Sequence, residues 1–422
     1  MLFFLTEGLR LPTALAGLAL LLPRIWDAAI DPFVGAISDR VKCKMGRRRP
    51  FLLVGGLTYG IAFALIFMVP HDLGTTAKFA WVVALYMITS TAFTFYDVPY
   101  SSMAAEMSET YEGRTVLTGY KMIAARLGIL LTILAAPALF SGSGNLALGF
   151  QQMGLWFGAF MVVTGLFAFF ATKHAPQIVR PVERFSLYSE FRALAENRPF
   201  LILWSVFLLQ NLAIGATATT LIYFAVFVMH MKPAMVGTLA AMGALSATLA
   251  TPVWTRIARR LGKRKTYFIS LTSAALLSLP ALFIAPDTQW LLFAVLFTAG
   301  IADGANQLMP NAMVPDTVEF DEHNTGQRRE GTIFGTWAFC RKLGMALGAF
   351  AVSLLLARFG FVEGGKPDMQ PQVAIDGIRI AYSLLPCLLW IGAILTLRHY
   401  HLDEVRFNTI KAAIDARRNN NA

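Results

Sequence analysis

The sequence predicts an all-α polytopic membrane protein built from two pseudo-symmetric helix bundles. Three observations predict this fold class: an apolar composition, a series of long apolar segments, and a basic motif that recurs about half a chain later. Of the 422 residues, 56% are hydrophobic and 14% are charged, whereas a soluble domain carries about 25% charged residues. The mean hydropathy of +0.57 is likewise typical of a chain that crosses a membrane repeatedly.

Eleven apolar segments are long enough to cross a bilayer, which takes about 20 residues of helix. They lie near residues 11–37, 51–69, 78–105, 116–140, 149–171, 200–229, 234–256, 266–285, 289–312, 331–357 and 377–397. The opening run MLFFLTEGL is too short to cross and is typical of the last turns of a helix. We therefore expect the first transmembrane helix to be truncated, which leaves about 11 full spans.

Basic residues distinguish the two sides of the membrane. Six of them lie in residues 40–49 and six in residues 256–265, whereas alternate loops such as SGSGNLAL and APDT carry none. Because cytoplasmic loops collect Lys and Arg, we expect the basic loops and the basic C-terminus to be cytoplasmic. This distribution explains the net charge of +11 without a nucleic-acid partner. It predicts a multi-pass protein of the cell membrane, expected to be a bacterial inner membrane.

One basic motif occurs twice. DRVKCKMGRRRPF at 39–51 is similar to TRIARRLGKRKTY at 255–267, and each copy joins the second and third helices of its half. Two halves repeated in parallel are the architecture of the major facilitator transporters. The domains expected from this are an N-terminal bundle at 1–172, a cytoplasmic linker at 173–199, a C-terminal bundle at 200–402 and a cytoplasmic tail at 403–422. A short amphipathic helix capped by Ser186 is expected in the linker.

Two carboxylates in one apolar run indicate a binding site. Asp27 and Asp31 are four residues apart in RIWDAAIDPFVG and share one helix face. Each charge at bilayer depth costs about 2.5–3.5 kcal/mol on insertion scales, and the two anions repel each other, so Na⁺ or H⁺ would remove both costs. Arg24, one turn earlier, can hold one carboxylate. The alternative is a salt-bridge network that only holds helices together, and the spacing leaves both interpretations open.

A third carboxylate, Asp97, lies in the middle of TAFTFYDVPYSSMAAEM. Pro99 kinks this helix and frees carbonyl groups near it, and Thr94 lies about one turn before the acid. A carboxylate beside the rings of Tyr96 and Tyr100 suits a polyhydroxylated ligand, because it accepts hydroxyl protons while the rings cover the apolar sugar face. A hydrogen bond between helices is the alternative role of Asp97.

A cation in a later span would balance these acids. Lys342 lies near the middle of its span in GTWAFCRKLGMALG, with Trp337 about one turn earlier. A lysine opposite the acids would neutralise a cavity, and its alternative role is snorkelling toward the membrane interface. Asp303, Asn306 and Gln307, on the corresponding helix of the second half, are weaker candidates because small polar residues often only pack helices.

The sequence offers no chemistry of an enzyme. It contains no nucleophile–base pair, phosphate-binding loop or metal-binding motif, and Cys43, Cys340 and Cys387 are far apart. We therefore expect a protein that is not an enzyme and that carries no resident cofactor or metal.

Several stretches of the sequence resemble one known family. They are RIWDAAIDPFVGAISDR, GRRRPF, YDVPYSSMAAEMSETYEGRTVLTGYK and PDTVEFDEHNTGQRREGTIFGTWAFCRKLG. In order and spacing, from about residue 1 to 400, they resemble the glycoside–pentoside–hexuronide:cation symporters, the melibiose-permease branch of the major facilitators. The resemblance implies a secondary active transporter that couples symport of a sugar or glycoside to Na⁺ or H⁺ by alternating access.

The resemblance also implies roles for individual residues. The implied cation site consists of Asp27, Asp31 and Thr94. The implied substrate residues are Asp97, Arg24 and Lys342, and we add Tyr96, Tyr100 and Trp337 from their positions beside them. Two departures from the family concern the sugar: Ser101 stands where melibiose permease has a tryptophan that packs on the sugar, and an arginine of its fifth helix has two candidate counterparts, Lys121 and Arg126.

Charged residues at the predicted cytoplasmic ends are candidates for a gate. Asp39, Arg40, Arg47 and Arg256 are expected to form ion pairs that hold the outward-facing state, with membrane topology alone as the alternative explanation. The expected partners are a small-molecule sugar or glycoside, the coupling cation and the lipid bilayer, and the chain is expected to be a monomer. Two other functions stay open: transport of an amphiphile such as a lysophospholipid, and a truncated membrane protein that does not transport.

Overall fold

The computed structural model describes residues 1–40, 45, 48–70, 72–107, 111–142, 145–173, 196–326, 329–402, 406–410 and 412–413. Over these residues the chain is helical and contains no strand. The contacts divide the chain into two compact units. The first unit is Met1–Arg184 with the short segments Pro233–Thr238 and Val362–Lys366, and the second is Phe185–Lys232, Leu239–Phe361 and Pro367–Ala422. The predicted linker helix and Arg47 lie outside the described residues.

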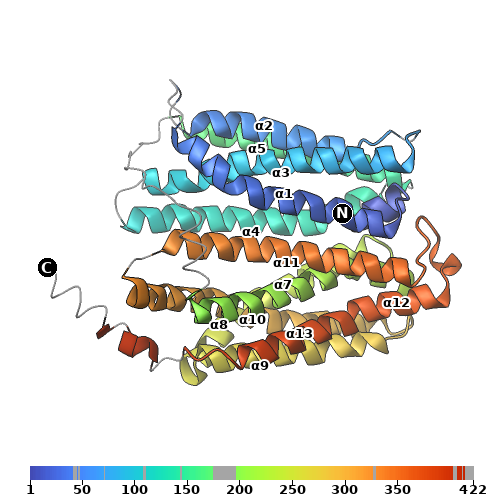
Figure 1. Cartoon of the computed structure of the whole chain (residues 1–422). Coiled ribbons are helices and arrows are strands. Elements are labelled where there is room, and N and C mark those ends of the chain that lie inside the picture. Colours follow the sequence, from blue (N-terminus) through green and yellow to red (C-terminus); the bar gives the residue numbers. More distant parts are fainter. Residues whose placement is uncertain are drawn as a thin grey trace. The chain divides into compact units, whose positions relative to one another are not determined.

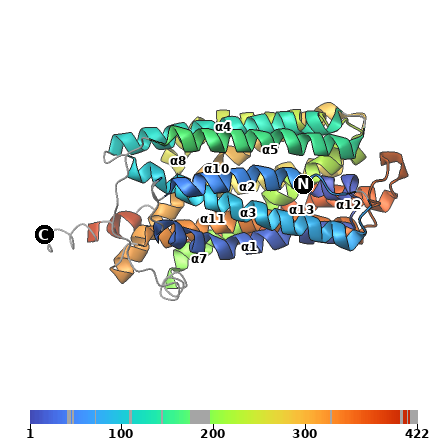
Figure 2. The same cartoon turned by 90° about the horizontal axis from the view of Figure 1, so that it is seen from above.

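The first unit is a bundle of five long helices and one short one. They are η1 (Phe4–Gly8), α1 (Thr13–Arg40), α2 (Arg49–Ile66), α3 (Thr75–Glu106), α4 (Tyr111–Ser141) and α5 (Leu146–Ala171). Helix α3 packs against both α1 and α2, and α5 packs against α2 and α4. Figure 1 and Figure 2 show α1, α2 and α3 running side by side. This packing brings the polar residues of α1 and α3 together.

The second unit is built from the later helices. They are α7 (Arg198–Tyr223), η2 (Phe224–Val228), α8 (Met235–Leu261), α9 (Lys263–Ser278), η3 (Leu279–Leu282), α10 (Gln289–Thr325), α11 (Glu330–Arg358), η4 (Pro367–Met369), α12 (Gln372–Tyr382) and α13 (Leu384–Leu397). Helix α7 packs against α11 and α13, and α9 packs against α10 and α13. The core of this unit is apolar and aromatic, with Tyr267 and Phe200 almost fully buried.

Helices α2 and α5 approach each other closely because glycines face each other across their interface. A Cβ atom built on Gly56 would lie 3.2 Å from Cα of Gly165, and one built on Gly60 would lie 2.5 Å from the carbonyl oxygen of Gly158. Small residues spaced four apart allow such backbone contact between helices in membranes, where packing is the main force that holds helices together. The contact makes α2 and α5 one tightly packed pair.

The opening residues and the end of α7 share one helix ending. In η1, the Leu9 N–H donates to the Phe4 carbonyl at 3.0 Å, and Arg10 has a φ of 55°. In η2, the Met229 N–H donates to the Phe224 carbonyl at 3.0 Å, and His230 has a φ of 51°. A residue in the left-handed region ends a helix by turning the chain away from its axis. The helix therefore ends in the same way at η1 in the first half and at η2 in the second half.

Each of the eleven predicted apolar segments overlaps a helix of the structure. Among the described residues, 8 helices are long and apolar enough to cross a membrane. Large apolar side chains such as Trp156, Phe167 and Trp290 are exposed, as expected of surfaces that face lipid. One segment differs from expectation: 377–397 is interrupted at Ser383, whose hydroxyl donates to the Ser278 carbonyl at 2.6 Å, so two helices replace one.

Candidate functional site

The candidate cation site lies where α1 packs against α3. Asp27 on α1 and Thr94 on α3 are both 2% exposed, and the Thr94 hydroxyl donates a hydrogen bond of 3.0 Å to Oδ1 of Asp27. This pair brings together two of the three residues predicted for the cation site. The third predicted residue, Asp31, lies on α1 four residues after Asp27, but its side chain falls outside the described part of the chain.

Arg24 is the basic neighbour of Asp27. One guanidinium nitrogen lies 3.9 Å from Oδ2 of Asp27, one turn along α1, and the guanidinium carbon lies 5.6 Å from the centre of the Tyr86 ring. The arginine is about one-third exposed, whereas the carboxylate is buried. At this distance the guanidinium compensates part of the carboxylate charge.

Asp97 belongs to a separate chain of polar contacts one turn further along α3. The Ser101 hydroxyl lies 3.4 Å from Oδ1 of Asp97, and the Lys121 ammonium group donates to the Ser101 oxygen at 2.6 Å. The same ammonium group lies 5.5 Å from the centre of the Tyr100 ring. Of the two residues that could replace the family's arginine on α4, Lys121 therefore faces the Asp97 region, and the Arg126 side chain is outside the described residues.

The two tyrosines near Asp97 pack mainly inside the bundle. Their rings are stacked with centres 5.6 Å apart, and both contact the small apolar cluster of Leu52, Met103 and Phe169. The Tyr96 ring also covers Gly56 of α2. Their part in sugar binding stays a prediction.

Trp337 and Lys342, also predicted for the substrate site, lie on α11 of the second unit. Trp337 is 5% exposed, stacks on Phe207 with ring centres 3.9 Å apart, and donates its indole N–H to Oδ1 of Asn311 at 3.0 Å. Lys342 is half-buried. Because these residues belong to a different unit from Asp97, their participation in one common site stays a prediction.

Helix α10 carries a polar face that the sequence indicated only in part. Gln307 and Asn311 are exposed and Asp303 is half-buried on successive turns of one face, and Gln307 hydrogen-bonds to the Asp303 carboxylate. Exposed amides in a membrane helix are costly against lipid and are expected to face water. Asn306 differs, because it is buried and accepts a hydrogen bond of 2.8 Å from Ser270, so it holds helices together.

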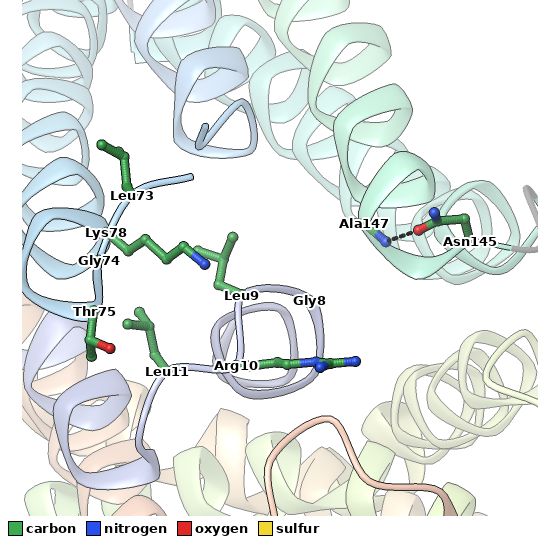
Figure 3. A pocket seen from close by; sticks show the side chains of 10 residues that line it. All are labelled: Gly8, Leu9, Arg10, Leu11, Leu73, Gly74, Thr75, Lys78, Asn145 and Ala147. Carbon is green, nitrogen blue, oxygen red and sulfur yellow. Dashed lines mark hydrogen bonds between the residues drawn. The ribbon is translucent and has the colours of Figure 1, made fainter. Parts of the chain in front are cut away.

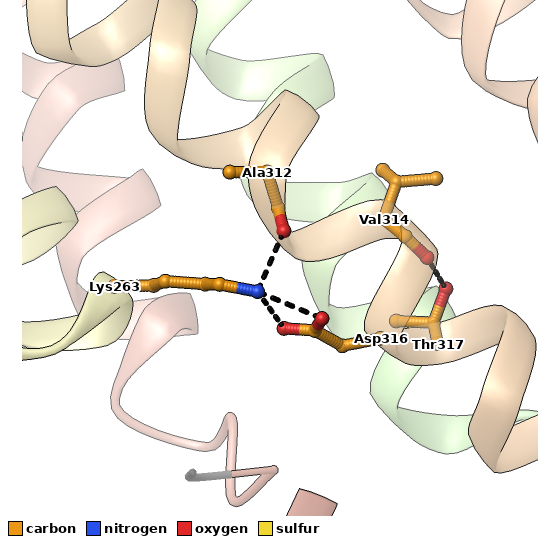
Figure 4. Close-up of polar contacts among 5 residues, drawn as sticks. All are labelled: Lys263, Ala312, Val314, Asp316 and Thr317. Carbon is orange, nitrogen blue, oxygen red and sulfur yellow. Dashed lines mark hydrogen bonds and ion pairs between the residues drawn. The ribbon is translucent and has the colours of Figure 1, made fainter. Parts of the chain in front are cut away.

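Charged contacts lie near the predicted cytoplasmic ends. In the second unit, the Lys263 ammonium group contacts both carboxylate oxygens of Asp316, at 2.7 and 2.8 Å, and the Ala312 carbonyl at 2.9 Å (Figure 4). The repeat alone did not indicate this ion pair, because Asp316 lies outside it. Arg256 is exposed.

The first copy of the motif also carries a contact that the sequence did not indicate. Arg49 is buried, donates to the Phe169 carbonyl at 3.2 Å, and lies over the Phe169 ring. It therefore joins α2 to the end of α5. The side chains of Asp39 and Arg40 fall outside the described residues, so the predicted gate stays a prediction.

The chemistry of the α1–α3 site suits a small hard cation. Na⁺ and H⁺ bind to carboxylate and hydroxyl oxygens, and cations of this kind favour oxygen ligands. The Thr94 hydroxyl donates its proton to Asp27, and a hydroxyl oxygen is also able to act as an acceptor. Within the described residues there is no group of three His, Cys, Asp or Glu side chains that could hold a metal ion. Binding of a coupling cation by this carboxylate and hydroxyl stays a prediction.

Comparison with known proteins identifies sequence relatives over the whole chain. A family profile described as "MFS/sugar transport protein" matches residues 1–404. The chain is 30% identical to the uncharacterized symporter YnaJ of Bacillus subtilis (strain 168), covering 99% of this chain and 90% of that protein. It is 25% identical to the glucuronide carrier protein homolog of Escherichia coli (strain K12), over 99% and 91% of the two chains. It is also 25% identical to the isoprimeverose transporter of Lactiplantibacillus pentosus, over 96% and 84%.

Solved structures match the fold. A bacterial homolog of the human lysosomal transporter Spinster, in an inward-facing and unoccupied conformation, superposes with a TM-score of 0.65 at 15% identity, covering 97% of this chain and 92% of the other. The nucleoside transporter NupG superposes with a TM-score of 0.59 at 14% identity, covering 95% and 93%. At these identities the similarity concerns the fold alone.

Proposed function

Because the chain belongs to the family of MFS/sugar transport proteins, we propose that it is a secondary active transporter that couples symport of a sugar or glycoside to Na⁺ or H⁺. Family membership makes it a multi-pass membrane symporter and not an enzyme. The choice of substrate and of cation, and the residues that bind them, belong to the proposal.

The observation that carries the proposal is the buried carboxylate of Asp27, hydrogen-bonded by Thr94 at 3.0 Å in a membrane-spanning bundle. A buried carboxylate in such a bundle is expensive unless a positive charge or proton accompanies it. Arg24 lies 3.9 Å from this carboxylate. In the proposed mechanism the coupling cation binds to Asp27, Asp31 and Thr94 and removes this cost.

The substrate part of the proposal rests on Asp97. In the proposed mechanism its carboxylate accepts hydroxyl protons of a sugar, with Arg24, Lys342, Tyr96, Tyr100 and Trp337 as the other substrate residues. Asp97 and Thr94 are three residues apart on α3, so a cation held by Thr94 alters the charge and position of the helix turn that carries Asp97. Binding of either ligand then favours binding of the other, and the coupling is reciprocal.

The names of the relatives support a sugar or glycoside as the substrate. One relative is named as a homolog of a glucuronide carrier and another as an isoprimeverose transporter. We propose the same class of substrate for this chain, and we propose that Asp39, Arg40, Arg47 and Arg256 break and form ion pairs as the bundles alternate.

The test is uptake by membrane vesicles that contain the full chain. Labelled glycosides, pentosides and glucuronides are offered with an imposed Na⁺ or H⁺ gradient. We expect Asp27→Asn to reduce gradient-driven accumulation by about tenfold or more, because a tenfold change corresponds to only about 1.4 kcal/mol of lost cation binding. Exchange of labelled for unlabelled substrate, which needs no gradient, is expected to continue in a folded but uncoupled protein.

The matched control is Asp72→Asn, because Asp72 is an exposed aspartate in a loop of the same unit. This variant is expected to accumulate substrate like the parent chain. Equal accumulation by Asp27→Asn and the parent would contradict the cation site. Accumulation that ignores both gradients would contradict symport.

A further inference from the structure

A loop late in the sequence caps the start of helix α1. Glu363 lies in the segment Val362–Lys366, which belongs to the first unit. One of its carboxylate oxygens accepts hydrogen bonds from the Thr13 backbone N–H at 2.8 Å and from the Thr13 hydroxyl at 2.5 Å. The first amides of a helix have no acceptor within the helix, and a carboxylate there is favoured by the helix dipole. Glu363 therefore supplies the N-terminal cap of the helix that carries Asp27.

A second carboxylate, Glu7, lies beside this cap. Its Oε1 atom is buried and has no hydrogen-bond partner among the described residues. The Gly364 N–H and the Thr6 hydroxyl hydrogen-bond to the carboxyl group, and the charged groups that act on it are Glu363 and Arg10. The carboxyl groups of Glu7 and Glu363 thus lie close together in a partly buried position, with Arg10 nearby.

The loop fits closely against the first turn of the chain. A Cβ atom built on Gly364, whose φ is +70°, would lie 2.7 Å from Nε of Arg10. A cavity of about 460 Å³ opens next to this contact, and Arg10, Leu11 and Lys78 are among the residues that line it (Figure 3). The side of Arg10 away from the loop therefore has room to move when the contact opens.

Burial is the main cause that raises the pKa of Glu7 from 4.5 to about 7, with a smaller contribution from the Glu363 carboxylate, while hydrogen bonds from Gly364 and Thr6 and the charge of Arg10 act to lower it. Glu7 lies outside the candidate membrane spans. Glu7 therefore binds its proton more tightly when the loop 362–366 lies against it, which we call the closed contact, than when it is exposed to water. The closed contact is therefore favoured in acid and loses this advantage as the pH rises from about 4.5 to about 7.

We propose that Glu363 is a positioning residue that latches the loop 362–366 onto the first turn of α1, and that a proton on Glu7 keeps this latch closed. The loop joins α11, which carries Lys342, to α12, whereas α1 carries Arg24 and Asp27. On the predicted topology, the latch lies at the extracellular end of α1. Any role of the latch in the transport cycle rests on the proposed function. The existence of the latch does not depend on that function.

The test measures whether the segment under the latch is accessible. Leu11 is 0% exposed and Met369, outside the latch, is 69% exposed. Intact cells that express Leu11→Cys or Met369→Cys are treated with a membrane-impermeant maleimide between pH 5.5 and pH 8. The parent chain gives the background, which comes from its own Cys43, Cys340 and Cys387. The ratio of the two labelling rates cancels the effect of pH on thiol reactivity.

We expect this ratio to rise by about 25-fold between the two pH values, because Glu7 loses its proton over this range. With Glu7→Gln added, the ratio is expected to stay low at every pH, because the amide is neutral. With Glu363→Ala, it is expected to be high at every pH. Asp368→Asn, an exposed acid nearby in sequence, is the control and is expected to behave like the parent. Leu9→Cys, buried on the same segment, serves as a second reporter if Leu11→Cys does not fold.

A ratio that does not change with pH in the parent, or that still changes in Glu7→Gln, would overturn the latch. Labelling needs no substrate, so it separates the latch from the proposed function. A pH-dependent ratio without gradient-driven uptake supports the latch and contradicts symport. Coupled uptake with a constant ratio contradicts the latch and leaves symport standing.

Discussion

At the scale of single residues, the site is defined by a buried carboxylate with two different neighbours. Asp27 has the Arg24 guanidinium at 3.9 Å on its own helix and the Thr94 hydroxyl at 3.0 Å on α3. The hydroxyl is the shorter contact and the arginine carries the charge. In the proposed mechanism, a cation that enters the site competes with the arginine for Oδ2 and joins the hydroxyl at Oδ1. The two contacts therefore have different consequences when they are removed.

The Thr94 hydroxyl is tested by Thr94→Val, which removes the oxygen and preserves the shape of the side chain. A lost hydrogen bond of this kind costs about 1 kcal/mol, so we expect the cation concentration for half-maximal uptake to rise about fivefold, with little change in the maximal rate. The measurement is uptake against cation concentration. Thr132→Val is the control, because the exposed Thr132 hydroxyl bonds only to the Gly128 carbonyl of its own helix; an equal shift in both variants would contradict a role for Thr94 in the cation site.

The sequence predicted some residues of this site and missed others for a physical reason. Asp27 and Thr94 were assigned to one site through the resemblance to a family, and their hydrogen bond agrees with that assignment. The contact from Lys121 to Ser101 could not be predicted, because the two side chains come from different helices and their meeting depends on how α3 and α4 rotate. The sequence also could not show that Phe207 would stack on Trp337, because these two rings come from different helices.

At the scale of helices, the first unit depends on the contact between α2 and α5. Gly60 and Gly158 bring the two backbones so close that each would place a Cβ atom within 2.6 Å of the carbonyl oxygen of the other. The sequence shows the glycines but not which of them face a neighbouring helix. Gly128, for example, lies within α4 and has open space beside it.

Gly60→Ala is therefore expected to separate the two helices or strain them, at a cost of about 1–3 kcal/mol. In detergent this is expected to lower the apparent melting temperature by about 5 °C. Gly128→Ala is the matched control and is expected to leave it unchanged or raise it slightly, because alanine favours helix over glycine. Equal melting temperatures for the two variants would contradict the close contact of α2 and α5.

At the scale of the whole molecule, the predicted family and fold class are confirmed. The family profile covers residues 1–404, and solved major facilitator transporters superpose on nearly the whole chain. The expectation of a transporter rather than an enzyme is confirmed by the same family. Composition and apolar segments sufficed for the all-helical membrane fold, because the bilayer permits so few kinds of spanning structure, whereas the family was predicted from the resemblance of several motifs. The helix ending shared by η1 and η2 was not predicted, since the two stretches have different side chains.

The orientation of the molecule in the membrane gives the last prediction. The distribution of basic residues places the C-terminal tail in the cytoplasm and the loop before α12 outside. A membrane-impermeant maleimide is therefore expected to label Met369→Cys in intact cells, and to label Asn408→Cys only after the cells are permeabilised. Both positions are exposed, so each is a control for the other. The opposite pattern would contradict the predicted topology.

The bond between Thr94 and Asp27 also has a consequence for biogenesis. Its two partners are 67 residues apart, so α1 leaves the ribosome well before α3 has been made. During that interval the Arg24 guanidinium lies near Asp27 on the same helix. A carboxylate and a guanidinium one turn apart enter a bilayer as a neutral pair, at less cost than either charge alone. The arginine therefore lowers the cost of inserting α1 before α3 has been made.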